Sequence, residues 1–86
     1  MAQVESVGGP VDVASLGTTL MHEHVFVLSE EIRQNYGGDW DEETRLADAA
    51  GKLNALRARG CDTIVDPTVI GLGRDIGRIK RVAART

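Results

Sequence analysis

The 86-residue sequence has a single cysteine, Cys61, and only one residue each of tryptophan, tyrosine and phenylalanine. One cysteine cannot form an internal disulfide bond, and a core with so few aromatic residues must be built from leucine, isoleucine, valine and alanine. No apolar run approaches the roughly 18 residues of a membrane span, and the first ten residues lack the basic start and apolar stretch of a signal peptide. We therefore expect a soluble, cytoplasmic protein that has no membrane partner.

Charge of one sign is not concentrated anywhere in the chain. Thirteen acidic and ten basic residues give a net charge of −3, and 42% of the residues are hydrophobic. This composition is typical of a globular domain, and the missing basic patch removes nucleic acid from the expected partners. A single domain of this length has a small core, so its stability is marginal unless it packs against a larger body.

Turn residues and apolar alternation predict a β-hairpin followed by a strand. Residues 1–17 alternate apolar with polar side chains around a Gly-Gly-Pro turn, which is typical of a hairpin. Residues 18–26 are rich in β-branched and large apolar side chains and have no helical period, so we expect a strand that is buried on both faces. Residues 28–40 are more polar and predict a loop that carries one short helical turn.

Two helices and a second strand are predicted in the remainder. The first helix begins after Asp39 or Asp41, either of which can cap its N-terminus, and ends before Gly60. A short β-branched run over residues 63–66 predicts a strand that Pro67 stops, and a glycine-rich connection leads into the second helix. Each helix has an apolar stripe at helical spacing: Leu46, Ala49, Ala50, Leu53 and Leu56 in the first, and Ile76, Ile79, Val82 and Ala83 in the second.

The order strand, helix, strand predicts a parallel βαβ unit with a right-handed crossover. Two parallel strands leave an open edge and an uncovered apolar face, because parallel sheets are normally covered on both sides. We therefore predict an α/β chain that begins a larger fold. It consists of a hairpin over residues 1–17, a first β/α unit over residues 18–60 and a second over residues 61–86.

The only two histidines, His22 and His24, stand one residue apart near the end of the predicted strand. Side chains at positions i and i+2 of a strand project to the same face, whereas on a helix they would diverge. Two neutral imidazoles on one face can bind one divalent ion such as zinc, with further ligands from elsewhere. A purely structural role is the competing interpretation. The carboxyl end of a parallel strand is where α/β folds gather their active sites, so we predict that both are metal ligands.

Four neighbouring features have more than one interpretation. Glu23 should face away from the histidines, and as a buried carboxylate it would form a structural hydrogen bond or support a ligand. Asp66 either supports the histidines or caps the loop that follows it. The Gly-Leu-Gly loop lacks the rest of a phosphate-binding motif, so a tight connection is the simpler interpretation. Cys61 is expected to be a small buried hydrophobe.

Residues 17–27, GTTLMHEHVFV, and residues 63–76, TIVDPTVIGLGRDI, carry a resemblance to a known family. With the helix between them they resemble the N-terminus of the phosphotriesterase family, specifically its phosphotriesterase-like lactonases. The resemblance runs from about Gly9 to the end of the chain. That family belongs to the amidohydrolase superfamily of metal-dependent (β/α)8 barrels. The resemblance therefore implies the N-terminal portion of a TIM barrel, a fold that needs roughly 250 residues.

The resemblance also implies roles for particular residues. His22 and His24 would be the first-strand ligands of the more buried ion in a two-metal site, with zinc as the expected metal and iron, cobalt or manganese as alternatives. Phe26, at the end of the strand, and Val27, just past it, would help line an apolar substrate entrance. The family's bridging carboxylated lysine, later histidines and catalytic aspartate belong to strands that this chain does not reach. No catalytic residue is therefore expected within these 86 residues.

In the family a hydroxide held between the metals attacks a lactone carbonyl or a phosphorus centre. The resemblance implies a hydrolase of small-molecule lactones, above all acyl-homoserine lactones, with organophosphate triesters as slower substrates. The complete barrel would be required, so the 86 residues alone are expected to be inactive. The sequence does not decide whether the complete enzyme is a homodimer. The alternative function is a small non-catalytic α/β protein that pairs with a partner through its open sheet.

Overall fold

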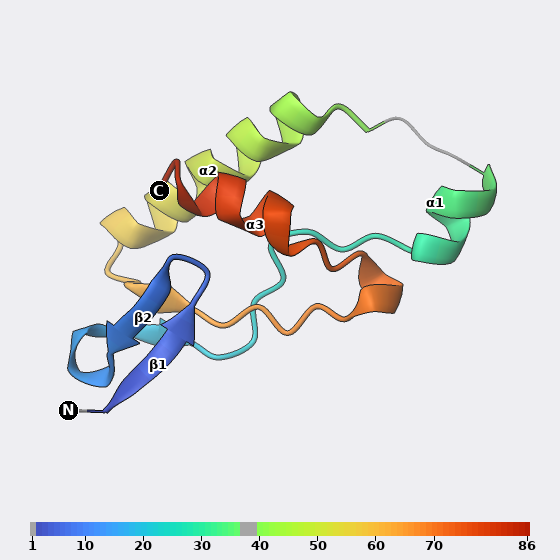
Figure 1. The fold of residues 1–86 in the computed structure, drawn as a ribbon. Coiled ribbons are helices and arrows are strands. Elements are labelled where there is room, and N and C mark those ends of the chain that lie inside the picture. Colours follow the sequence, from blue (N-terminus) through green and yellow to red (C-terminus); the bar gives the residue numbers. More distant parts are fainter. Residues whose placement is uncertain (1, 37–39) are drawn as a thin grey trace.

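The computed structural model describes residues 2–36 and 40–86, and their arrangement is elongated (Figure 1). The principal extents are 47 × 24 × 18 Å and the radius of gyration is 14.1 Å. A compact domain of this length would have a radius of gyration of about 12 Å. The chain therefore forms a slab in which few side chains are enclosed from every side.

The chain begins with the predicted hairpin. Strands β1 (Gln3–Ser6) and β2 (Gly9–Asp12) pair in antiparallel register, with Ser6 opposite Gly9 next to the turn. Gly9 has φ +116°, a conformation that glycine adopts without a Cβ penalty. Figure 1 shows this hairpin beside the short parallel strand pair and well away from α1.

Strands β3 (Thr19–Leu20) and β4 (Thr63–Ile64) pair in parallel, which confirms the βαβ connection. The predicted extents, residues 18–26 and 63–66, are wrong because each strand ends after two residues. Beyond them the two segments stay side by side through separate hydrogen bonds. The Val65 amide donates to the Leu20 carbonyl at 2.8 Å, and the Glu23 amide donates to the Val65 carbonyl at 3.0 Å.

The predicted polar loop contains more helix than expected. Helix α1 (Glu30–Tyr36) has seven residues and lies beside the 3-10 turn η2 (Ile70–Leu72), as Figure 1 shows. Two glutamates in its first turn favour the positive end of the helix dipole, and Arg33 pairs with Glu30 at 2.8 Å. These local interactions favour a short helix where a single helical turn was expected.

The core lies between helices α2 (Glu42–Ala58) and α3 (Ile76–Ala83), which run side by side in Figure 1. Asp41 caps α2 by accepting from the Thr44 amide at 3.3 Å, whereas Asp39 lies outside the described residues. The apolar stripes are confirmed in part. Ile76, at 51% exposed, and the exposed Ala83 do not join the core. The buried apolar residues are Leu46, Ala49, Ala50 and Val82.

Part of the apolar surface of the strand pair is exposed. Leu20 is 38% exposed, Met21 70% and Val65 40%, so the expectation of a strand buried on both faces is wrong for this chain. An apolar groove of about 860 Å³ also opens between the hairpin and α3, lined in part by Val11 and Ile79. None of the helices in the described part of the chain has the length and apolar character that a membrane crossing requires.

Candidate metal centre

His22 and His24 lie immediately after β3, at the carboxyl end of the parallel pair. Their Nε2 atoms are 3.2 Å apart and their ring centroids 5.0 Å apart, with the ring planes at 75°. The predicted convergence is therefore present, although both residues follow the strand instead of alternating within it. A bent backbone segment brings the two rings together.

The spacing of the two nitrogens fits a shared metal ion. Two nitrogens that each lie 2.0 to 2.1 Å from one tetrahedral ion are roughly 3.3 Å apart. Among the described residues no group of three or more histidine, cysteine, aspartate or glutamate side chains could hold a metal by itself. The pair has the geometry of two ligands, and further ligands must come from outside this set.

Thr68 connects His24 to Asp66. The His24 Nδ1 atom is 2.7 Å from the Thr68 hydroxyl, which donates to Asp66 Oδ1 at 2.5 Å. The direct separation of His24 Nδ1 from Asp66 Oδ1 is 3.9 Å, too long for a hydrogen bond. Thr68 is 6% exposed and is the polar residue buried most deeply in the described chain. The hydroxyl therefore bridges two groups that do not reach each other.

Asp66 serves both of the roles that the sequence left open. Its Oδ1 accepts from the Thr68 amide at 3.0 Å, which caps the following loop, and its Oδ2 accepts from the Val25 amide at 3.2 Å, beside His24. Burial raises the pKa of this carboxyl, but the hydrogen bonds from Thr68 and Val25 lower it more, so the net shift is downward. The Val25 amide is bound to a side chain instead of a strand carbonyl, so the pairing between the two segments does not extend to Val25.

The segment after the histidines is fixed against the loop that leads to α3. The Leu28 amide donates to the Leu72 carbonyl at 2.8 Å. Gly73 is buried with φ +89°, and a Cβ there would stand 2.8 Å from the Leu28 Cβ. The glycine-rich loop thus acts as a close-packed connection, in agreement with the simpler interpretation, and only glycine fits this approach.

Three further residues were singled out near the histidines. Glu23 is exposed, so the expected buried carboxylate is wrong, because the strand that would have buried it ends at Leu20. The Phe26 ring packs against the helical core and meets the Trp40 ring edge-to-face at 5.7 Å between centroids. Val27 is 56% exposed. The two adjacent apolar side chains therefore have different surroundings.

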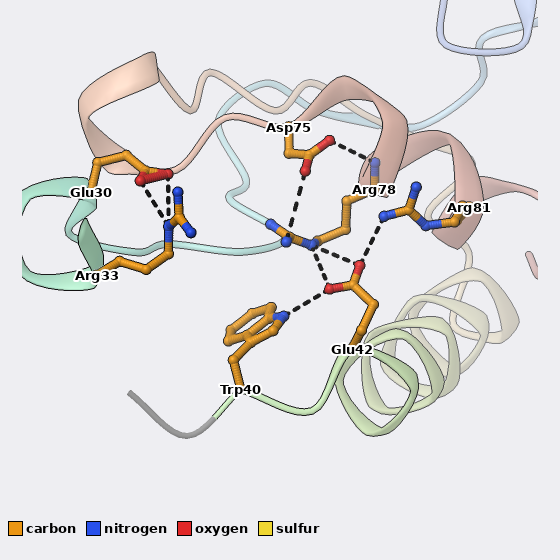
Figure 2. Close-up of polar contacts among 7 residues, drawn as sticks. All are labelled: Glu30, Arg33, Trp40, Glu42, Asp75, Arg78 and Arg81. Carbon is orange, nitrogen blue, oxygen red and sulfur yellow. Dashed lines mark hydrogen bonds and ion pairs between the residues drawn. The ribbon is translucent and has the colours of Figure 1, made fainter. Parts of the chain in front are cut away.

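A second polar cluster joins α2 to α3, as Figure 2 shows. Arg78 Nε donates to Glu42 Oε1 at 2.9 Å, Arg81 donates to the same oxygen at 2.9 Å, and Trp40 Nε1 donates to Oε2 at 2.8 Å. The Arg78 guanidinium also lies 5.1 Å from the Trp40 ring centroid and 5.9 Å from that of Phe26. Hydrogen bonds from Arg78, Trp40 and Arg81 lower the pKa of Glu42 to about 2. Both carboxylate oxygens of Glu42 therefore accept hydrogen bonds from side chains of the fold.

Sequence reasoning missed Thr68 and the Glu42 cluster. Thr68 is a β-branched residue in an apolar run, and its pattern is that of an ordinary strand or loop residue. An Asp-Pro-Thr turn is the one local signal, since the Asp carboxylate can accept from the backbone two residues later. Glu42 and Arg78 are 36 positions apart, and their pairing depends on how the two helices pack.

The sequence profile described as the Phosphotriesterase family matches residues 2–86. The chain belongs to the phosphotriesterase family. A phosphotriesterase homology protein of Mycobacterium tuberculosis is 59% identical over 87 residues, which cover all of this chain and 27% of the relative. An aryldialkylphosphatase of Saccharolobus solfataricus is 38% identical over 76 residues, covering 88% of this chain and 24% of the relative. This phosphotriesterase-family chain therefore spans about a quarter of the length of the relatives it matches.

Solved structures of the phosphotriesterase family overlay the chain closely. The phosphotriesterase from Mycobacterium tuberculosis matches 99% of it with a TM-score of 0.91 and 58% identity. A mutant organophosphorus hydrolase from Deinococcus radiodurans matches 98% with a TM-score of 0.88 and 35% identity. The chain covers 26% of each of these structures. The predicted fold class, the N-terminal portion of a (β/α)8 barrel, is confirmed.

Proposed function

We propose that residues 1–86 supply two metal ligands, His22 and His24, to a complete barrel that hydrolyses ester bonds of lactones and phosphotriesters. The observation that carries this proposal is the 3.2 Å separation of the two Nε2 atoms at the carboxyl end of the parallel strands. That end of the strands is where barrels of this class place their chemistry. Family membership supports the same conclusion.

Each histidine would contribute one Nε2 lone pair, and the remaining ligands would come from other strands of the barrel. Two divalent ions per complete site, zinc foremost, would supply Lewis acidity and lower the pKa of a bound water. Within this chain Thr68 and Asp66 hold the His24 ring in place, and the hydrogen bond between Leu28 and Leu72 fixes the segment beyond it. The chain thus orients ligands and contributes no general base.

Lactones, especially acyl-homoserine lactones, are the proposed preferred substrates, with organophosphate triesters as secondary ones. One structural match is an organophosphate hydrolase engineered from a weak promiscuous lactonase template, with a TM-score of 0.91 and 34% identity. We propose that Val27 lines the substrate entrance, because its side chain is 56% exposed just beyond the ligand pair. Phe26 would support that position from the core side, where it packs on Trp40.

The open sheet also bears on the alternative function. The apolar side chains left exposed by the strand pair are those of Leu20, Met21 and Val65. Further β/α units cover this kind of surface in a complete barrel. We therefore infer that this surface contacts the rest of the barrel. The test described below also distinguishes this role from the binding of a separate partner.

The test joins residues 1–86 to the remaining three quarters of the 59% identical mycobacterial relative. We expect the chimeric barrel to bind divalent metal and to hydrolyse an acyl-homoserine lactone faster than a phosphotriester. The 86-residue chain alone, the matched control, should hydrolyse neither, because it has only two ligands. A folded chimera that lacks metal and activity would contradict the proposal and favour a partner-binding role.

A further inference from the structure

We propose that Thr68 is a positioning residue that sets the tautomer of His24, so that Nε2 of this ring faces His22 as an unprotonated acceptor. The proposal rests on the hydrogen-bonding capacity of three groups in contact. Its consequence for metal binding depends on the proposed function, whereas the tautomer itself does not.

The direction of each hydrogen bond follows from counting protons. A threonine hydroxyl has one proton to donate, and an ionised carboxylate has none. The short contact between Thr68 Oγ1 and Asp66 Oδ1 therefore uses the Thr68 proton. Thr68 can then only accept from His24 Nδ1, 2.7 Å away. The proton of the neutral His24 ring is on Nδ1, and Nε2 retains its lone pair.

The contact between the two histidines gives a second consequence. Their Nε2 atoms are 3.2 Å apart, a separation that suits both a hydrogen bond between the rings and two nitrogens on one tetrahedral ion. Because His24 Nε2 has no proton in this tautomer, a hydrogen bond between the two rings would take its proton from His22 Nε2. Metal binding would then require His22 alone to move its ring proton to Nδ1, while His24 is already in its ligating form.

The burial of Thr68 indicates that its hydroxyl has a role beyond filling space. The residue is 6% exposed, and no buried side-chain nitrogen or oxygen in the described residues lacks a partner. Removing the hydroxyl would leave Asp66 Oδ1 without its side-chain donor and His24 Nδ1 without an acceptor. Groups that orient a ligating histidine in this way typically contribute a factor of roughly 10 to 100 to metal affinity.

The experiment uses the chimeric barrel described above, stripped of metal and labelled with 15N-histidine. Single His22→Asn and His24→Asn variants assign the two rings. In the parent we expect His24 with a protonated Nδ1 and His22 with a protonated Nε2. Thr68→Val keeps the shape of the side chain and removes the hydroxyl, so the His24 proton should no longer prefer Nδ1. Thr68→Ser should restore that preference. Zinc affinity should fall roughly 10- to 100-fold in Thr68→Val and recover in Thr68→Ser.

The readouts separate this inference from the proposed function. A parent barrel whose His24 carries its proton on Nε2 would overturn the inference, as would a folded Thr68→Val barrel with the parent's tautomer and zinc affinity. A parent barrel with the expected tautomers but no zinc binding at the histidines would support the tautomer assignment and overturn the proposed function. Circular dichroism of each variant confirms that the comparison is made between folded proteins.

Discussion

The two polar clusters of this chain are built from similar groups but differ in what they leave available. In the α2/α3 cluster both oxygens of Glu42 accept from Arg78, Arg81 or Trp40. In the other cluster, Thr68, which is itself bound to Asp66, contacts only the Nδ1 nitrogen of the His24 ring. The remaining nitrogen faces His22, the only other histidine of the chain.

This difference distinguishes a cluster that stabilises the fold from a cluster that is a candidate binding site. A structural cluster consumes its hydrogen-bonding capacity inside the fold, because an unsatisfied buried polar group costs free energy. In a pair of metal-ligating histidines, one ring nitrogen is held by a hydrogen bond, and the other nitrogen keeps its lone pair for the metal. The Glu42 cluster should therefore affect stability, and the His24 cluster should affect metal binding.

The largest expected effect is loss of metal from the His24 cluster. His22→Ala or His24→Ala in the chimeric barrel should remove most bound metal and most lactone hydrolysis, because each residue supplies a ligand with no replacement nearby. Metal analysis and lactone turnover measure the two effects. Glu23→Gln is the matched control, since Glu23 lies between the histidines and is exposed. Parent-like metal content in both alanine variants would remove the ligand assignment.

A smaller effect is expected at Val27, which lies just beyond the two histidines and is 56% exposed. Substitutions of different size should change the ranking of lactone chain lengths by roughly 10-fold, because a methylene in an apolar pocket contributes about 1 to 3 kcal/mol. Metal content should stay unchanged. kcat/KM values for a series of acyl chain lengths test this, and an unaltered ranking across several side chains would place Val27 outside the pocket.

The Glu42 cluster should show the reverse pattern. Glu42→Gln should lower the free energy of unfolding by about 1 kcal/mol, because the pairs are partly solvent-screened, and should leave zinc affinity intact. Glu43→Gln is the matched control. Glu43 pairs with Arg85 at 2.8 Å but is 72% exposed, so its loss should lower the free energy of unfolding less than Glu42→Gln does. Urea unfolding and zinc titration of both variants make the comparison, and a selective loss of zinc in Glu42→Gln would break the distinction between the clusters.

The smallest effect is the pH dependence of that stabilisation. The pKa of Glu42 falls from 4.5 to about 2 in the folded chain. A lowered folded pKa adds stability that is present above pH 4.5 and disappears as the pH falls toward 2. The stability difference between the parent and Glu42→Gln should therefore be constant from pH 7 to 5 and shrink below pH 4.5. A difference that grows on acidification would contradict the ion-pair account.

The sequence predicted those parts of the fold that depend on local patterns. The hairpin, the Asp41 cap and the buried positions Leu46 and Val82 follow from alternation, capping and helical spacing. The lengths of β3 and β4 could not be predicted, because each strand pairs with a segment that is distant in the sequence, as Thr19 does with Thr63. The convergence of the two histidines was predicted for a strand and is produced by a bend. Thr68 was missed because its role depends on a contact 44 positions away.

The most direct test of the central claim is the anomalous scattering of zinc in crystals of the chimeric barrel. We expect one of the two zinc ions to have Nε2 of both His22 and His24 at about 2.0 to 2.1 Å, with Thr68 still within hydrogen-bond distance of His24 Nδ1. A barrel in which no zinc contacts both histidines, or in which zinc contacts either ring through Nδ1, would contradict the ligand assignment.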